Sequence, residues 1–345
     1  MRNLRIVIAL VVVSSVSLFS QSEIGTGPGL PDPFGPPELN WGKLPDGRAW
    51  GSTAGVEIGP HNEVWAIERC SGTRCDDSDL PAVQLLDLKT GKAIRGIGGG
   101  LFAYPHGLHV DRDGNVWVSD AAATKDGKRG HQVVKFSPDG KILMTLGEAG
   151  VPGGGPTHFN EPCDVITNRN GEIFVADGHG GASAKDPNYV TRIVVFSKNG
   201  KWLREWGKLG TGPGEFKNPH ALAFDSRGRL FVADRFNSRL QIFDQTGKFI
   251  AEWTQFGMPS GLYIDRNDTM YVIDADSNAK NHPGWTRGIR IGSARDGKVT
   301  AFVPPTVNEK YPDGMAGEGV LPGPDGNLYA AENVLRGITR YLKKQ

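Results

Sequence analysis

The sequence lacks the marks of a nucleic-acid-binding or membrane-spanning protein. Its 39 lysines and arginines are balanced by 38 acidic residues, which gives a formal net charge of +1, and no basic tract stands out. Binding to nucleic acid or to an anionic membrane therefore lacks its electrostatic footprint. Beyond the first 20 residues, no stretch is apolar enough to cross a bilayer. We expect neither nucleic acid nor a membrane among the partners of this chain.

Residues 1–20 have the pattern of a secretory signal peptide. They begin with two arginines, continue with the unbroken apolar run Ile6–Val13 and end in small residues, with a cleavage site expected near Ser20. The alternative, a membrane anchor, is disfavoured because the run is too short to span a bilayer comfortably. No cysteine lies near the cleavage region, which argues against a lipoprotein. We expect an exported protein, either periplasmic or secreted.

Cysteine is scarce as well, with three residues in the whole chain. Cys70 and Cys75 are close in sequence and suit a small disulfide-closed loop in an exported protein. The alternative, a metal-binding pair, lacks a second Cys or His pair at a suitable spacing. Cys163 is left over, and we interpret it as a buried small residue.

Glycine and proline, by contrast, are abundant, with 48 and 23 residues, as an all-β chain with many turns requires. The stretch Leu101–Asp120 contains two strand-like runs around an Asp-Arg-Asp-Gly turn, and it recurs along the chain. Further copies lie at 159–177, 219–234 and 259–274, with weaker ones at 53–68 and 317–332. Six copies of one hairpin predict a repeat fold.

A second hairpin follows the first within these units. It is clearest at 132–147, 192–207 and 240–253, where Asp-Gly, Asn-Gly and Thr-Gly occupy the tips. Four strands in each of six units predict an all-β fold, a six-bladed β-propeller with NHL-like repeats, over residues 51–345.

The last unit ends after Ile338–Leu342 and is one strand short. The N-terminal segment 21–50 is the remaining source of a strand, and its piece 39–50 has a strand-like pattern. We therefore expect residues 39–50 to close the last blade and to staple the ring shut.

The repeat also predicts which end of the propeller carries the site. His106 starts the first strand of a hairpin and Asp120 ends the second, so both lie at one end. Long insertions fall at that same end, at 121–130, 147–158, 178–189 and 276–288, whereas the other end has only tight turns. Variable loops on a rigid scaffold commonly carry binding sites, so we call this end the working face.

The first position of every blade is expected to face the central channel. Aligning the six hairpins places there Ala54, His106, Cys163, His220, Ser260 and Glu318. Imidazole and carboxylate are ordinary zinc ligands, and three protein ligands with an open position are the catalytic arrangement. We predict a metal site at His106, His220 and Glu318, for zinc or another divalent transition metal. The alternative is that each is a polar residue that caps its strand.

The ends of the second strands carry an acid in all six blades: Glu68, Asp120, Asp177, Asp234, Asp274 and Glu332. We interpret these acids as turn formers that accept backbone N–H bonds. The residues that follow them differ between blades, with Arg69, His179 and Arg235 after three of them. Two guanidinium groups at the working face suit bidentate binding of a carboxylate ligand. The alternative is surface arginines paired with the neighbouring acids.

Four segments of the chain carry a family resemblance: 101–108 (LFAYPHGL), 159–164 (FNEPCD), 214–222 (GEFKNPHAL) and 232–235 (VADR). The repeats look like NHL repeats, and most of the chain after the signal peptide resembles the peptidyl-α-hydroxyglycine α-amidating lyase family. The resemblance implies a catalytic zinc held by three inner-ring histidines. Two of these match His106 and His220, and the third falls at Glu318.

The resemblance also implies roles for further residues. The two active-site arginines of the family match Arg69 and Arg235. Its catalytic tyrosine falls at His179, with Tyr189 at the far end of the following insertion as a substitute. The family's structural calcium uses an aspartate where this chain has Gly319, so calcium is poorly supported.

Register and resemblance together lead us to expect an exported metal-dependent carbon–nitrogen lyase that releases an amide and glyoxylate. The metal would bind the substrate hydroxyl, Arg69 and Arg235 would hold its carboxylate, and His179 or Tyr189 would be the general base. The substrate is then a small or peptide-derived carboxylate, and the protein a monomer. Two alternatives stay open, namely a non-catalytic NHL-type binding propeller and a six-bladed hydrolase or lactonase.

Overall fold

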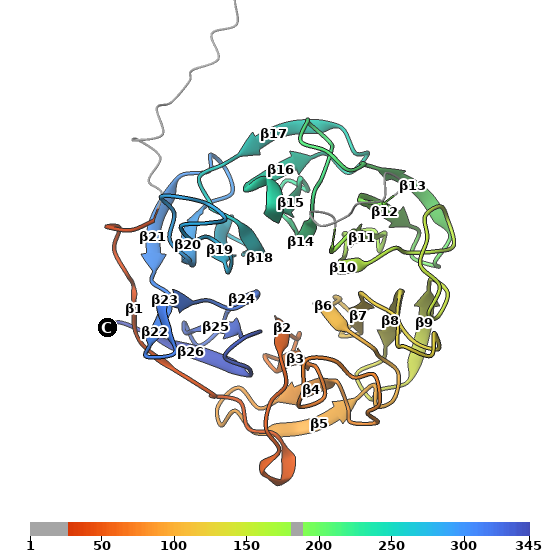
Figure 1. The fold of residues 1–345 in the computed structure, drawn as a ribbon, viewed down its shortest axis with the longest axis horizontal. Coiled ribbons are helices and arrows are strands. Elements are labelled where there is room, and N and C mark those ends of the chain that lie inside the picture. The colour runs from red at the N-terminus through yellow and green to blue at the C-terminus, as the bar shows by residue number, and fades with distance from the viewer. Residues whose placement is uncertain (1–26, 181–188) are drawn as a thin grey trace, which may run out of the picture.

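The computed structural model describes residues 27–180 and 189–345, so the signal peptide expected at 1–20 lies outside the described residues. Over these two ranges the strands form six four-stranded sheets, arranged around a common axis as Figure 1 shows. The six-bladed β-propeller expected from the repeats is confirmed. No helix in the described ranges is long and apolar enough to cross a membrane.

Each of the first five blades uses four consecutive strands, with the innermost strand first. In chain order these strands are β2 (Thr53–Ile58), β3 (Val64–Glu68), β4 (Val83–Leu86), β5 (Ala93–Ile97); β6 (Pro105–Val110), β7 (Val116–Asp120), β8 (Gln132–Phe136), β9 (Ile142–Leu146); β10 (Pro162–Thr167), β11 (Ile173–Asp177), β12 (Arg192–Phe196), β13 (Trp202–Trp206); β14 (Pro219–Phe224), β15 (Leu230–Asp234), β16 (Arg239–Phe243), β17 (Phe249–Trp253); β18 (Pro259–Ile264), β19 (Thr269–Asp274), β20 (Gly288–Ser293) and β21 (Val299–Val303).

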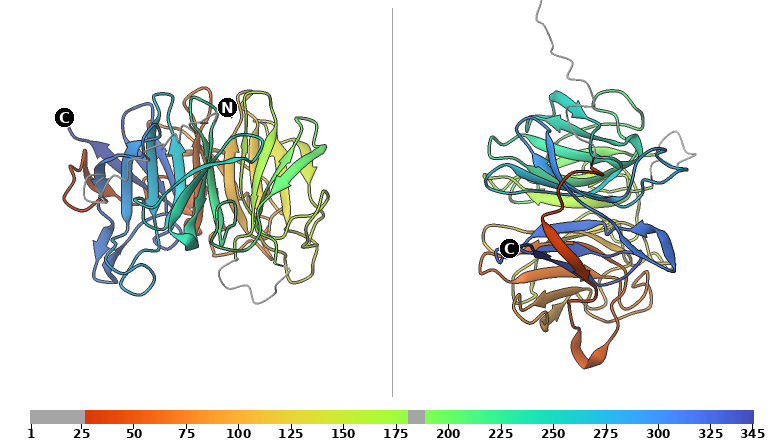
Figure 2. Two further views of the ribbon diagram at one scale, coloured as in Figure 1. Left: turned by 90° about the horizontal axis from the view of Figure 1, so that it is seen from above. Right: turned by 90° about the vertical axis from the view of Figure 1, so that its left-hand side faces the viewer.

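The last blade contains β24 (Gly319–Pro322), β25 (Leu328–Ala331) and β26 (Ile338–Lys343), and β1 (Phe34–Glu38) completes it by pairing antiparallel with β26. Figure 2 shows β1 lying along the blade that ends at the C-terminus. The N-terminal segment therefore does close the ring. The remaining elements are the hairpin β22 (Thr306–Asn308) and β23 (Tyr311–Met315) and the 3-10 helices η1 (Pro45–Gly47) and η3 (Arg235–Asn237).

The closing strand differs from the expected one, because it lies just before residues 39–50. Pro36 and Pro37 hide it in the sequence, since proline lacks the N–H that a central strand needs. β1 is the outermost strand of its sheet, where one side of the backbone requires no ladder partner. Residues 39–50 contribute Trp41 and Trp50 instead, which pack in a buried cluster between the last and the first blades.

Hydrophobic cores lie between neighbouring blades. One core joins Trp65 and Val83 of the first blade to Val118 and Phe136 of the second. The second strands of the first four blades are buried along their whole length, whereas the outer strand β9 is largely exposed. A rigid set of inner strands therefore surrounds the axis.

A β-bulge follows the first proline of the inner strands. Pro105 pairs with Asp120, and the register then shifts before Leu108. The same shift follows Pro162, Pro219 and Pro259 in the next three blades. The residue after each proline is the inner-ring position, and bulges commonly re-aim a side chain in this way. The pairing also confirms that positions 106 and 120 lie at one end of the propeller.

Candidate metal centre

The inner-ring residues line the central channel as expected: Ala54, His106, Cys163, His220, Ser260 and Glu318 all border it. His106 and His220 are each 3% exposed. Buried imidazoles need a partner for each ring nitrogen, so the partners of these two rings decide what the site can hold.

One nitrogen of each buried imidazole is satisfied by the neighbouring blade. Nδ1 of His106 lies 2.9 Å from the carbonyl oxygen of Cys163, and Nδ1 of His220 lies 2.6 Å from that of Ser260. A carbonyl only accepts, so Nδ1 carries the proton in both rings and Nε2 keeps its lone pair. Both Nε2 atoms are buried and have no hydrogen-bond partner among the described residues.

His179 joins these two histidines. The ligand atoms of His106, His179 and His220 all lie within 4.8 Å of one another. Their ring centroids are separated by 4.5 Å, 4.7 Å and 5.4 Å. The three rings come from blades two, three and four and converge on one point at the working face.

The geometry therefore differs from the ligand set expected from sequence, His106, His220 and Glu318. The third histidine of the group is His179, for which we expected the role of a base. Glu318 stays beside the group, with Oε2 3.9 Å from Nε2 of His106. The expected register was correct for position 318, but His179 follows β11 by two residues and lies outside that register.

Electrostatics favour the neutral form of all three imidazoles. Burial lowers the pKa of His106 to about 4, despite the opposing effect of Glu318. Burial also holds the pKa of His179 and of His220 well below the usual value, and positive neighbours reinforce it. Neutral imidazoles with a backbone-held Nδ1–H and a free Nε2 are the usual histidine ligands of zinc. The residues present therefore fit such an ion.

The acids at the ends of the second strands hold the loops that carry the inner ring. Asp120 accepts N–H bonds from Ala103 and Tyr104, just before His106. Asp234 accepts them from Lys217 and Asn218, just before His220. The interpretation as backbone acceptors is confirmed for Asp120 and Asp234, although here the loops precede the inner strand. In the last blade, Glu332 Oε1 is buried without a hydrogen-bond partner among the described residues.

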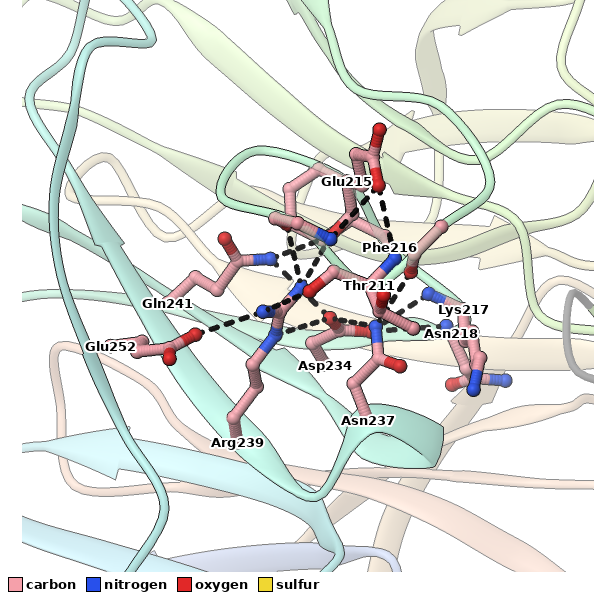
Figure 3. Close-up of polar contacts among 12 residues, drawn as sticks. Thr211, Glu215, Phe216, Lys217, Asn218, Asp234, Asn237, Arg239, Gln241 and Glu252 are labelled. Atoms are coloured by element: carbon pink, nitrogen blue, oxygen red, sulfur yellow. Dashed lines mark hydrogen bonds and ion pairs between the residues drawn. The ribbon is translucent and has the colours of Figure 1, made fainter.

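Asp234 is itself held by a buried network, which Figure 3 shows. Arg239 Nε donates to Asp234 Oδ2 over 3.0 Å, and the same guanidinium contacts Glu252 and the carbonyls of Thr211, Gly212 and Glu215. The loop that leads into His220 is thus fixed at several points. Such support orients a ligand for a metal or substrate.

Arg69 is a buried guanidinium with spare hydrogen-bonding capacity. It is 2% exposed, and it donates through Nε to the carbonyl of Pro105 and through Nη1 to Asn333. Its Nη2 has no hydrogen-bond partner among the described residues. Because no carboxylate pairs with it there, Arg69 is placed to receive an anionic ligand.

Arg235, the other expected arginine, is already paired. Its Nη1 lies 3.3 Å from Asp276 and 3.4 Å from Glu318. The residue is 6% exposed, so neither arginine is the surface residue of the alternative interpretation. Of the two guanidinium groups, Arg235 has carboxylate partners, whereas Arg69 forms no ion pair with any described residue.

Tyr189 does not join the histidine group through any contact that the structure shows. Its hydroxyl donates to Glu161 Oε2 over 2.5 Å and accepts from Gly180 N over 2.8 Å. Burial and Glu161 raise the pKa of Tyr189. A phenol engaged in this way is poorly placed to serve as the base that the sequence suggested.

Tyr104 is a site residue that the sequence analysis quoted but gave no role. The guanidinium of Arg69 lies 3.7 Å from its ring centroid. The ring also lies 6.1 Å from that of His106 and 5.9 Å from that of His179. Its position two residues before an inner-ring histidine is the only signal that points to it in the sequence.

The cysteines behave as expected. Cys70 and Cys75 form a disulfide, which closes a loop immediately after Arg69. Cys163 is free and fully buried, and its carbonyl supports His106. Burial raises the pKa of its thiol well above the usual value.

Fold and site together define a six-bladed propeller with a histidine cluster at the mouth of its channel. The NHL repeat family model matches residues 216–243, so the chain contains an NHL repeat. The resemblance stated from the sequence is confirmed by relatives. The chain is 38% identical over 152 residues to a probable peptidyl-alpha-hydroxyglycine alpha-amidating lyase of Caenorhabditis elegans, covering 43% of this chain and 39% of the relative.

Two further relatives match at similar levels. Identity is 32% over 251 residues to the rat peptidylglycine alpha-amidating monooxygenase, covering 64% of this chain and 24% of the relative. It is 36% over 142 residues to NHL repeat-containing protein 3 of the mouse, covering 39% of this chain and 38% of the relative. The chain thus spans less than half the length of these relatives.

A solved structure supports the architecture. A gluconolactonase of Xanthomonas campestris superposes with a TM-score of 0.57 at 14% identity, covering 86% of this chain and 88% of that chain. At this level of identity the likeness concerns the fold alone.

Proposed function

We propose that this protein is an exported metal-dependent carbon–nitrogen lyase that cleaves a peptidyl-α-hydroxyglycine-like substrate into an amide and glyoxylate. Similarity to relatives named as amidating lyases supports a lyase-like role. The observation that carries the proposal is the convergence of three neutral histidines near the buried Arg69, whose Nη2 has no hydrogen-bond partner among the described residues. This pairing of groups suits a substrate with a hydroxyl beside a carboxylate.

The metal ligands in this proposal are His106, His179 and His220. Zinc or another divalent transition metal bound there supplies Lewis-acid polarisation of the substrate hydroxyl and lowers its pKa. The free, buried Nε2 atoms of His106 and His220 support this assignment. Calcium has no place in it, because neutral imidazoles are poor ligands for a hard cation.

Substrate orientation falls to the arginines. Nη2 of Arg69, which has no hydrogen-bond partner among the described residues, donates to the substrate carboxylate. Arg235 stays bound to Asp276 and Glu318, so it holds those carboxylates in place and adds positive potential. The substrate is a small or peptide-derived carboxylate, and a monomer suffices because all these groups come from one chain.

Glu318 is the proposed proton acceptor, in place of His179 and Tyr189. Its Oε2 is buried without a hydrogen-bond partner and lies beside His106, while Oε1 pairs with Arg235. The hydroxyl proton moves to Glu318, the oxygen's electron pair forms the new C=O bond, and the C–N bond breaks with its pair on nitrogen. Nitrogen then takes up a proton, so the reaction needs no other reactant.

The test combines metal analysis with an assay of glyoxylate release from hydroxyglycine peptides. We expect about one zinc per chain and turnover in the purified protein, with both lost in His220→Ala. The matched control is His61→Ala, which removes an exposed histidine. Full activity in His220→Ala, or no transition metal in protein prepared without chelator, would overturn the proposal.

A non-catalytic binding propeller is the second candidate. Similarity to NHL repeat-containing protein 3 favours it, because that name states a repeat and no reaction. The two candidates differ in whether they require a metal. A binding propeller needs no histidine group, so its binding function would survive the His220→Ala substitution.

A further inference from the structure

Tyr104 lies close both to Arg69 and to two members of the histidine group. Its ring is stacked under the guanidinium of Arg69 at 3.7 Å, and the guanidinium of Arg74 lies 5.5 Å from the ring centroid. The same ring lies 6.1 Å from the ring of His106 and 5.9 Å from that of His179. A ligand that contacts both Arg69 and the histidine group therefore lies near Tyr104.

The backbone of Tyr104 is fixed while its hydroxyl is free. Asp120 Oδ1 accepts the N–H of Tyr104 over 2.5 Å, and the carbonyl accepts from Ala121. The side chain is half-buried, and its hydroxyl makes no hydrogen bond to any described residue. By contrast, the hydroxyls of Tyr189 and Tyr329 are both bonded to carboxylates. A preorganised donor without a partner suits a ligand.

We propose that the Tyr104 hydroxyl donates a hydrogen bond to the carbonyl oxygen of the departing amide, while its ring holds Arg69 for the substrate carboxylate. This role rests on the proposed lyase function. The amide is assigned to Tyr104 because the proposed function already assigns the substrate carboxylate to Arg69 and the substrate hydroxyl to the histidine group.

The chemical need for such a donor arises as the C–N bond breaks. The electron pair of that bond passes to the amide nitrogen and is shared with the carbonyl oxygen. A hydrogen bond donated to this oxygen is stronger in the transition state than in the bound substrate, because negative charge develops on the oxygen as the C–N bond breaks. Nitrogen finally takes the proton that left the hydroxyl, so atoms and electrons balance.

The experiment compares Tyr104→Phe with Tyr271→Phe. Tyr271 is a half-buried tyrosine of β19 whose pKa is raised by burial and by the charge of Asp265. Both variants lose one hydroxyl and keep the ring. We expect Tyr104→Phe to lower kcat by about 10²-fold with KM and zinc content unchanged, and Tyr271→Phe to match the wild type. In Tyr104→Leu, which also loses the ring, we expect KM to rise because Arg69 is no longer stacked.

A series of para-substituted N-benzoyl-α-hydroxyglycines separates this role from a merely structural one. If the hydroxyl stabilises the leaving amide, kcat of Tyr104→Phe depends more steeply on the leaving group than kcat of the wild type. A uniform loss across the series, or an unchanged kcat, overturns the role of Tyr104 and leaves the lyase in place. A wild-type protein that binds zinc but turns over no member of the series overturns the proposed function and, with it, this role.

Discussion

The side-chain amide of Asn218 donates a hydrogen bond to the backbone carbonyl of His179. The two residues lie in different blades and are 39 positions apart. Asn218 is fully buried, and its own N–H is held by Asp234. This bond explains how a histidine from a loop of blade three comes to lie beside the inner-ring histidines of blades two and four.

Loss of this bond is expected to weaken metal binding. In Asn218→Ala the carbonyl of His179 loses its partner, so the third ligand is no longer held toward the other two. We expect zinc affinity to fall by roughly 10–100-fold, as is typical when the support of a ligand is removed. Competition with a chromophoric chelator measures it. The control is Asn237→Ala, because Asn237 contacts Asp234 but not His179; equal affinities in the two variants would contradict the role of Asn218.

The identity of the third ligand can be decided by substitution. We expect His179→Ala to lose zinc, because only two imidazoles would remain at the centre, whereas Glu318→Gln should retain about one zinc per chain. Elemental analysis of both proteins gives the result. Zinc retained in His179→Ala and lost in Glu318→Gln would restore the ligand set expected from the sequence.

Much of the architecture was accessible from the sequence, because a propeller repeats its local pattern. Turn residues marked the hairpins, and register placed His106, His220 and Glu318 on one axis. The closing strand was misplaced by a few residues, since prolines in Phe34–Glu38 mask an edge strand. The sequence pattern does not reveal this strand, because an edge strand forms ladder hydrogen bonds on one side only and therefore tolerates prolines.

The site was less accessible, since its third histidine follows no repeat. His179 reaches the group from a loop, and its anchor Asn218 comes from another blade. Tyr104 was hidden for a related reason, because its role depends on the stacking of Arg69, 35 positions earlier in the chain. Contacts between blades depend on how the ring closes, so they cannot be predicted from a short segment of the sequence.

Arg69 is expected to control substrate affinity. Arg69→Lys keeps the charge but loses the planar fork and its stacking on Tyr104. We expect KM for a hydroxyglycine peptide to rise about 10–100-fold, the value of a charged hydrogen bond or two, with unchanged zinc content. Steady-state kinetics provide the measurement. Arg266→Lys, at an exposed turn, is the control; an equal KM in both variants would remove Arg69 from substrate binding.

The disulfide is expected to act through the same arginine. Cys70 is the residue after Arg69, so the Cys70–Cys75 bridge limits how far that loop can move. In the Cys70→Ser/Cys75→Ser variant we expect a higher KM and a loss of about 2 kcal/mol in the free energy of unfolding, the entropy of a short closed loop. Kinetics and urea titration measure the two effects. A stability loss with an unchanged KM would limit the bridge to a structural role.

Two carboxyl groups further along the channel are expected to make stability depend on pH. Glu57 and Asp164 both line it. Burial, and then the charge of Asp164, raises the pKa of Glu57 to about 8, and burial raises the pKa of Asp164 to about 7.

Because these raised values belong to the folded state, the folded chain keeps protons that the unfolded chain releases near pH 4 to 5. The free energy of unfolding should therefore fall as the pH rises from about 5 to above 8, and Glu57→Gln should remove about 2 kcal/mol of that fall. Urea titrations at pH 6 and pH 9 test this, with the exposed Asp113→Asn as control. If Glu57→Gln and the wild type lose the same stability between the two pH values, the Glu57 carboxyl is ionised in the folded protein throughout, and water or a cation in the channel must stabilise its charge.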